Sequence, residues 1–261
     1  MKQILGRKQS ISNDRWKEAF DQIEALVSPD ELEETVQRTL EDILEKTKGR
    51  KAAYCWSGGK DSIVLSDICQ QAGVTDCMFA HTELEYPEFM GWCLTNMPKG
   101  CEVISTGQNL EWLSHHQEMI FPKGKELNAW YSGVQRRAFT EYFFAHGLDI
   151  ILVGHRKADG NFCGPGNMIR KSTGETRYAP LAEWPHEMIL AYIHYHQLKL
   201  PPIYGWKNGF RCGTHPWPSR MYMQDLHQGY SEVWEIDPEI IKEAAGIIDS
   251  ARTFLEEVTA K

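Results

Sequence analysis

The residues best suited to chemistry form one short run between an apolar segment and a helical pattern: Ser57, Gly58, Gly59, Lys60, Asp61 and Ser62. A β-favouring stretch, Tyr54 to Trp56, leads into the run, and apolar residues at helical spacing follow it. A helix N-terminus offers unpaired N–H groups and the positive pole of the helix dipole, which favour a phosphate. The glycines let the backbone close around an anion, the lysine adds a mobile positive charge, and the serines add hydroxyl donors. The run therefore predicts a nucleotide-binding loop.

The same run resembles the Ser-Gly-Gly-x-Asp-Ser loop of the ATP pyrophosphatase (PP-loop) superfamily. Members of that superfamily expose the α-phosphate of ATP and break the α–β bond, which releases pyrophosphate. The Walker loop does not fit, because it needs four residues between its glycines and then Gly-Lys-Ser/Thr. A chance glycine turn after a strand is the alternative, but all six motif positions stand in the required strand–loop–helix context.

A second segment, Phe79–Glu88, narrows the resemblance to the phosphoadenosine phosphosulfate (PAPS) reductase branch. It is similar to that branch's Leu-Asp-Thr-Gly segment, with Pro-Glu-Thr following. Thr82 matches the threonine, whereas His81 and Glu83 replace the aspartate and the glycine. In the family this strand end holds adenine through backbone groups, so the resemblance implies nucleotide contacts for His81 and Thr82. A polar strand end that binds no ligand is the alternative.

A third segment, Val153–Asp159, is similar to the family's Gly-x-Arg-Arg-x-Glu-Ser segment. Two adjacent cations at a strand end suit an anion better than a core. The resemblance implies nucleotide contacts here, with the glycine allowing close backbone approach and the cations facing phosphates; a solvated basic turn is the alternative. The residues concerned are Gly154, His155, Arg156 and Lys157. Four further basic residues on facing loops are predicted to contact phosphate or substrate: Arg136, Arg137, Arg170 and Lys171.

Two later segments extend the resemblance, which runs from about Ala52 to Cys212. Tyr178–Glu187 is similar to the family's Pro-Leu-x-x-Trp segment, and Leu200–Tyr204 is similar to its Leu-Pro-x-x-Pro-Leu-Tyr stretch. Both segments are expected to serve packing, because their aromatic and apolar residues recur at helical spacing.

The cysteines depart from the family pattern. Iron–sulfur members carry Ser-Ile-Gly-Cys-x-x-Cys, and here only Cys212 matches, with His215 at the second cysteine. One thiol cannot hold a four-iron cluster, so no iron–sulfur cluster is expected, and no metal site is predicted. Family reductases carry their nucleophile in a C-terminal Glu-Cys-Gly-x-His tail, and no cysteine follows Cys212. Cys212 begins a Cys-Gly-x-His sequence itself, which makes it a candidate for a relocated nucleophile.

The fold class predicted is α/β: a Rossmann-like parallel sheet flanked by helices, adenine nucleotide alpha hydrolase-like, with a helical, loop-rich C-terminal portion. We expect an N-terminal helical segment at 1–50, a PP-loop nucleotide-binding core at 51–160, and substrate-side loops and helices at 161–261. The expected strands are Ala52–Trp56, Asp76–His81, Glu102–Ser105 and Asp149–Gly154. The expected helices are Glu31–Lys48, Ser62–Gln71, Pro87–Asn96, Leu110–Met119, Gly133–His146, Pro185–Gln197 and Pro238–Val258. Ligands in such sheets lie beyond the carboxyl ends of the strands.

Composition excludes several classes of function. The chain has 261 residues, of which 42% are hydrophobic, and a formal net charge of −8, which argues against general attraction to nucleic acid or anionic lipid. No apolar run approaches a membrane span, and the polar start of the chain lacks a secretory h-region. The seven cysteines form no Cys-x-x-Cys pair. We therefore expect a cytoplasmic protein without membrane contact or a disulfide framework.

The sequence favours an enzyme that cleaves ATP at the α–β bond to adenylate an acceptor that the sequence does not identify. Lys60 would neutralise the leaving pyrophosphate, Mg²⁺ would bridge its oxygens, and Asp61 would orient the loop or hold the metal. One alternative is an adenylyl sulfate or PAPS reductase that uses Cys212, with thioredoxin as its partner. The other is a catalytically silent nucleotide-binding adaptor. The charged N-terminal helix could pack across a homodimer.

Overall fold

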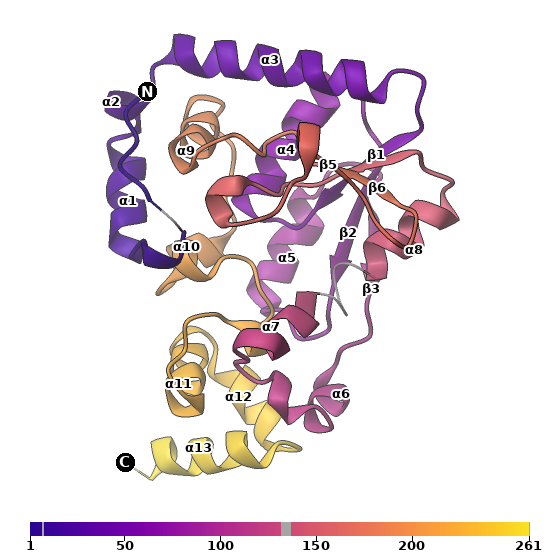
Figure 1. Cartoon of the computed structure of the whole chain (residues 1–261). Coiled ribbons are helices and arrows are strands. Elements are labelled where there is room, and N and C mark those ends of the chain that lie inside the picture. The colour runs from indigo at the N-terminus through magenta and orange to yellow at the C-terminus, as the bar shows by residue number, and fades with distance from the viewer. Residues whose placement is uncertain (7, 132–136, 261) are drawn as a thin grey trace. The chain divides into compact units, whose positions relative to one another are not determined.

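The computed structural model describes residues 1–6, 8–131 and 137–260. Its six strands form one sheet in the order β3-β2-β1-β4-β6-β5 (Figure 1). Strand β1 pairs in parallel with β2 and β4, β4 pairs in parallel with β6, and β5 runs antiparallel to β6. The sheet is therefore mixed but mostly parallel, which confirms the predicted fold class. The strands are β1 (Ala52–Trp56), β2 (Cys77–His81), β3 (Glu102–Ser105), β4 (Ile150–Leu152), β5 (Met168–Arg170) and β6 (Thr176–Tyr178).

The chain divides into two compact units, and each is described by itself. The first unit comprises Met1–Phe79, Asn96–Val103 and Phe139–Pro201, and it holds most of the sheet. The second unit comprises Ala80–Thr95, Ile104–Ala138 and Pro202–Lys261.

The first unit packs its helices around the central strands. Strand β4 is an apolar run that is fully buried, as is typical of a parallel strand covered on both faces. Ser28 caps α3 in a reciprocal capping box with Glu31, and Pro29 occupies the first turn, so α3 begins two residues before the predicted start at Glu31. The helices of this unit are α1 (Asn13–Asp21), α2 (Ile23–Leu26), α3 (Pro29–Thr47), α4 (Lys60–Gln71), α9 (His186–Tyr195) and, from Phe139 onward, α8 (Arg137–Ala145).

The second unit is mainly helical. A single C-terminal helix was expected, but the chain forms two, because the first ends at Gly246 and the next begins at Asp249. The helices of this unit are α5 (Pro87–Asn96), α6 (Leu110–Ser114), α7 (Gly124–Tyr131), α10 (Gly209–Cys212), α11 (Leu226–Ile236), α12 (Pro238–Ala245) and α13 (Asp249–Thr259).

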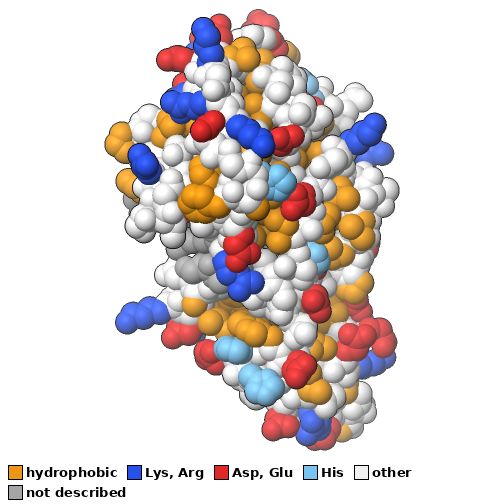
Figure 2. All heavy atoms as spheres, turned by 90° about the vertical axis from the view of Figure 1, so that its right-hand side faces the viewer, with side chains coloured by type: hydrophobic (Ala, Val, Ile, Leu, Met, Phe, Trp, Pro, Cys, Tyr) orange, Lys and Arg blue, Asp and Glu red, His pale blue; other side chains and the backbone are white. Residues whose placement is uncertain are grey.

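The charge of the surface and the hydropathy of the helices both bear on function. On the face shown in Figure 2, acidic and basic side chains are interspersed, in keeping with the net charge of −8. Among the described residues, no helix is both long enough and apolar enough to span a bilayer.

Candidate functional site

The loop between β1 and α4 is closed by its own side chains. Ser62 Oγ accepts a hydrogen bond from the Ser57 N–H at 3.0 Å and donates one to the Gly59 carbonyl at 2.9 Å. Gly58 has a φ of +66°, in the left-handed region that favours glycine, and Gly59 caps α4. The first N–H groups of α4 have no acceptor within the helix. The loop is therefore built to present backbone donors, and nucleotide binding there stays a prediction.

Lys60 is not the mobile cation that the sequence predicts. Its side chain is 3% exposed, its Nζ donates to Asp61 Oδ2 at 2.7 Å, and its ammonium lies 5.2 Å from the centre of the Trp16 ring. Burial lowers the pKa of Lys60, although the Asp61 carboxylate opposes that shift. Lys60 is thus a fixed, buried cation, held between Asp61 and the Trp16 ring.

Asp61 has both carboxylate oxygens engaged. Oδ2 accepts from Lys60, and Oδ1 forms an ion pair with Arg156 Nε at 2.7 Å. Burial alone would raise the pKa of Asp61, but Arg156 and Lys60 outweigh it and hold that pKa well below its usual range. This geometry fits a role in orienting the loop.

Arg156 is turned into the interior of the first unit. Its side chain is fully buried and pairs with Asp61 and with Asp159 Oδ2, the latter at 2.9 Å. It also donates to the Trp184 carbonyl at 3.1 Å. The expectation that Arg156 faces phosphates is therefore corrected, because two carboxylates hold its guanidinium inside. Lys157 is half exposed and pairs with Glu183.

Arg156 also determines which ring nitrogen of His186 carries the proton. Arg156 lies 3.1 Å from His186 Nδ1, and a guanidinium can only donate, so Nδ1 accepts and the ring proton is on Nε2. Burial, followed by the charges of Arg156 and Lys60, lowers the pKa of His186 to about 3. The ring is therefore neutral at physiological pH.

We expect the His186 ring to stay neutral with its proton on Nε2 at pH 5, because its pKa lies at about 3. An unfolded histidine titrates near pH ~6.5, so the stability that the neutral ring contributes is complete above that pH and is lost as the pH falls toward 3. Nitrogen-15 NMR of the ring checks this prediction, with exposed His227 as the control. Protonation of His186 above pH 5.5 would contradict it.

Gly154 approaches the start of α4 closely. A Cβ added there would lie 3.5 Å from the Asp61 carbonyl carbon and 3.5 Å from the Ser62 nitrogen. The glycine therefore lies against the helix that begins at the loop, whereas the sequence suggested that it lets the backbone approach the nucleotide. His155 is part-exposed between Gly154 and the buried Arg156.

Lys60, Asp61, Arg156, Asp159 and His186 form a charged network behind the loop, and Trp16 packs against it. Sequence reasoning missed three of these residues. Asp159 stands at the family's glutamate, but only the cations before it were singled out. His186 lies in a segment that was assigned to packing, and Trp16 precedes the whole resemblance. The position of Asp159 in the motif was the one signal that could have found it.

The residues predicted to hold adenine belong to the second unit. The Thr82 side chain and N–H donate to Glu85 Oε1 at 3.2 and 3.3 Å, and His81 Nδ1 lies 2.7 Å from the Thr82 carbonyl. Burial raises the pKa of Glu85 to about 7, although the hydrogen bonds from Thr82 oppose that shift. Adenine contact by His81 and Thr82 stays a prediction.

Cys212 is a buried thiol. Its side chain is 1% exposed, and its Sγ lies 3.5 Å from the Met221 carbonyl. Neighbouring Arg211 stacks its guanidinium on the Tyr222 ring at 4.5 Å. Reactive cysteines are partly exposed, so this placement does not favour Cys212 as a nucleophile. Cys163 is buried as well, and burial raises the pKa of its thiol.

The four other predicted phosphate contacts are not brought to the loop. Arg136 lies outside the described residues, and Arg137 donates to the Thr106 carbonyl at 3.2 Å in the second unit. Arg170 pairs across the hairpin with Thr176, the first residue of β6, so Arg170 and Lys171 lie at the amino edge of the sheet. The loop follows the carboxyl end of β1. The prediction that Arg170 and Lys171 lie on loops facing the phosphate site is therefore wrong. Strand β5 runs antiparallel to β6 and so carries them to the other edge of the sheet.

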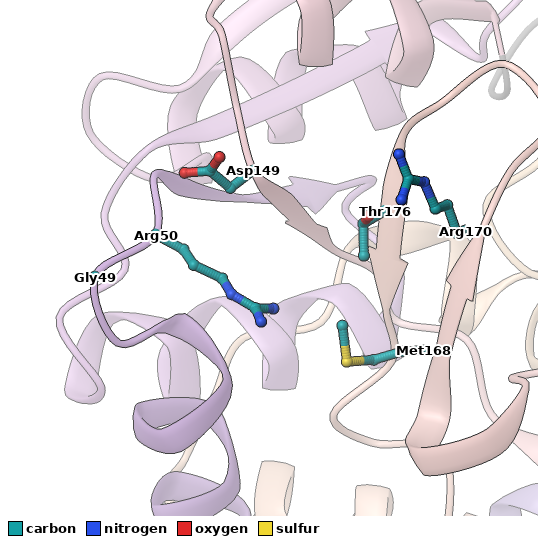
Figure 3. A pocket seen from close by; sticks show the side chains of 6 residues that line it. All are labelled: Gly49, Arg50, Asp149, Met168, Arg170 and Thr176. Atoms are coloured by element: carbon teal, nitrogen blue, oxygen red, sulfur yellow. The ribbon is translucent and has the colours of Figure 1, made fainter.

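Arg170 instead lines an open cavity of about 500 Å³ at that amino edge (Figure 3). Arg50 lies two residues before β1 and Asp149 lies directly before β4, and their side chains lie around the same cavity. The Asp149 carboxylate is held by the Lys51 N–H at 2.8 Å. The cavity is lined by Gly49, Arg50, Asp149, Met168, Arg170 and Thr176.

The described residues do not form a protein ligand set for a metal. No group of three or more histidine, cysteine, aspartate or glutamate side chains there could hold an ion. Asp61, the acid nearest to the loop backbone, has its oxygens committed to Lys60 and Arg156. Asp61 therefore does not fit as a Mg²⁺ ligand, and Mg²⁺ would be held by phosphate oxygens and water.

The match to a family profile agrees with the motifs. The family profile of the phosphoadenosine phosphosulfate reductase domain matches residues 51–212. A PAPS reductase from Candida auris, solved as a phosphate complex, is 14% identical with a TM-score of 0.49 and covers 69% of this chain and 94% of its own. An NMN synthetase from Francisella tularensis is 17% identical with a TM-score of 0.46 and covers 64% of this chain and 71% of its own. No curated protein sequence matches this one.

Proposed function

The chain belongs to the phosphoadenosine phosphosulfate reductase domain family, and we propose that it binds ATP at Ser57–Ser62 and cleaves the α–β bond. The observation that supports this proposal most directly is the loop itself. Gly58 takes the left-handed conformation, and Ser62 closes the turn onto Gly59. A closed glycine turn at a helix N-terminus is a ready site for a phosphate.

In this proposal the loop binds the leaving pyrophosphate. An oxygen of the acceptor attacks the α-phosphorus and forms a new P–O bond. The bond from the α-phosphorus to the bridging oxygen breaks, and pyrophosphate leaves with the electron pair. The donors of the loop and of the first turn of α4 stabilise the charge that develops on it. AMP remains on the acceptor until a later nucleophile displaces it.

Lys60 and Asp61 act indirectly in this proposal. Their mutual ion pair, together with the pair between Asp61 and Arg156, holds the first turn of α4 in place. The positive charge of Lys60 still acts on a nearby anion, because low dielectric surroundings weaken screening. Mg²⁺, when bound with the nucleotide, supplies charge neutralisation at the phosphate oxygens.

The experiment compares two glycines at opposite ends of α4. Gly58 and Gly73 have φ values of +66° and +78°, so alanine at either position costs about 1–2 kcal/mol of backbone strain. No atom lies within 4 Å of a Cβ at Gly73. Titration calorimetry measures ATP–Mg²⁺, adenylyl sulfate and PAPS binding to the native chain, to Gly58→Ala and to the control Gly73→Ala. We expect the native chain to prefer ATP and Gly58→Ala to bind it at least about tenfold more weakly.

Each alternative result bears on a different part of the proposal. Equal ATP affinity in the two glycine variants would remove the loop as the binding site. A preference for adenylyl sulfate or PAPS would overturn ATP cleavage and favour the reductase alternative. Binding of none of the three nucleotides would overturn the proposal as a whole.

A further inference from the structure

We infer that the N-terminal arm, the described residues between 1 and 16, is a positioning element of the loop at Ser57–Ser62. This inference rests on the proposed function, because it assigns the arm to the same site. The family match begins at residue 51, so the arm is no part of the matched domain. It nevertheless contacts three side chains of the charged network behind the loop, Lys60, Asp159 and His186, and also the buried Glu187 on α9.

The start of the arm is anchored at α9. Glu187 is fully buried in the first turn of that helix, and its Oε1 accepts from the N–H groups of Ile4 and Leu5, each at 2.6 Å. A buried carboxylate needs such donors, so the arm and the helix stabilise each other. Helices α1 and α2 continue alongside α9 (Figure 1).

Lys8 changes the charge of the network. Its Nζ lies 3.8 Å from Asp159 Oδ1, while the other oxygen of Asp159 pairs with Arg156. Without Lys8, the two cations Lys60 and Arg156 balance the two carboxylates Asp61 and Asp159. With Lys8, these five groups carry an excess of one positive charge, since His186 is neutral and the Glu187 carboxylate is compensated separately by the Ile4 and Leu5 N–H groups. That excess favours a phosphate at the adjoining helix N-terminus.

Trp16 fixes the direction of Lys60. The indole is fully buried and packs edge-on against the His186 ring at 4.6 Å, and the Lys60 ammonium lies 5.2 Å from its centre. A buried ammonium needs compensation for lost water, which the indole face and Asp61 supply together. Lys60 therefore stays paired with Asp61, and Asp61 keeps the start of α4 in place. Without the ring, Lys60 would gain water and release Asp61.

The test uses the full chain with conservative and disruptive changes at the two arm residues. Trp16→Phe keeps an aromatic face and Trp16→Leu removes it; Lys8→Arg keeps the charge and Lys8→Met removes it. Ile241→Ala, a fully buried position in the second unit, is the control for general loss of core packing. Calorimetry measures the Kd for ATP, and hydrogen exchange without nucleotide measures the protection of the amides at Ser57–Ser62.

We expect Trp16→Leu to raise the Kd about tenfold and to speed exchange at Ser57–Ser62 by a similar factor, whereas Trp16→Phe stays within about threefold of the native chain. Lys8→Met should raise the Kd about threefold and Lys8→Arg should restore it. Because Trp16 acts through Lys60, Trp16→Leu should cost no further affinity in a Lys60→Met background.

Three results would overturn the inference: effects of Trp16→Leu no larger than those of Ile241→Ala, full additivity with Lys60→Met, or equal affinity of Lys8→Met and Lys8→Arg. If Trp16→Leu does not fold, the Lys8 pair decides alone. If the native chain binds no adenine nucleotide, the proposed function fails, and hydrogen exchange still decides the inference. Faster exchange confined to Ser57–Ser62 in the arm variants would then support it, and unchanged exchange would overturn it.

Discussion

Replacing Arg156 by methionine is expected to lower the free energy of unfolding by about 3–5 kcal/mol, the usual cost of removing one partner from a buried ion pair. Arg156 is fully buried and is paired with both Asp61 and Asp159. Its removal leaves the Asp61 and Asp159 carboxylates, whose side chains are 23% and 9% exposed, with one cation fewer. Urea denaturation of the native chain and of Arg156→Met measures the difference.

The neighbouring cation provides the control. Lys157 is 51% exposed and pairs with Glu183 at the surface, so Lys157→Met should change the free energy of unfolding by less than about 1 kcal/mol. Adding Asp61→Asn and Asp159→Asn to Arg156→Met should recover part of the loss, because the unpaired charges disappear. A loss below about 1 kcal/mol in Arg156→Met would contradict the prediction and would show that water at the partly exposed Asp61 compensates for the lost pair.

The direction of Arg156 shows where prediction from sequence ends. The sequence places two cations after the strand, but it does not say which of them turns inward. That choice depends on Asp61 and His186, which are distant along the chain and meet Arg156 only in the folded unit. The residue pattern around Arg156 does not show which distant side chains will contact it. The neutral state of His186 follows from the same packing.

The strands also include some that the sequence predicts and some that it does not. The bounds of β1 and β3 agree with the sequence prediction, because short β-favouring runs stand there between turn and helix signals. Strands β5 and β6 are three residues each, too short for an alternating pattern, and they went unpredicted. The antiparallel course of β5 then carries Arg170 to the edge of the sheet opposite to the loop. One missed hairpin thus misplaced a predicted site residue.

Gly154→Val is expected to lower the free energy of unfolding by about 2–3 kcal/mol, as overpacking of a close contact does. It should also weaken ATP binding by at least about tenfold, since the displaced element is the first turn of α4. A Cβ at Gly154 lies at ordinary contact distance from the backbone of Asp61 and Ser62. Valine adds two further carbons with a restricted χ1 to that Cβ, so we expect them to press on the same backbone. Gly154→Ala should therefore retain stability within about 1 kcal/mol and ATP affinity within about threefold.

The alanine variant separates two reasons for a glycine at this position. If the glycine is needed because the backbone meets the helix, alanine is tolerated and valine harms stability and binding together. If it is needed because the backbone meets the nucleotide, as the family resemblance suggests, alanine alone should abolish ATP binding and leave the urea midpoint unchanged. Calorimetry and urea denaturation on the same two variants give opposite results for the two reasons. The contact distances of 3.5 Å to the start of α4 favour the first.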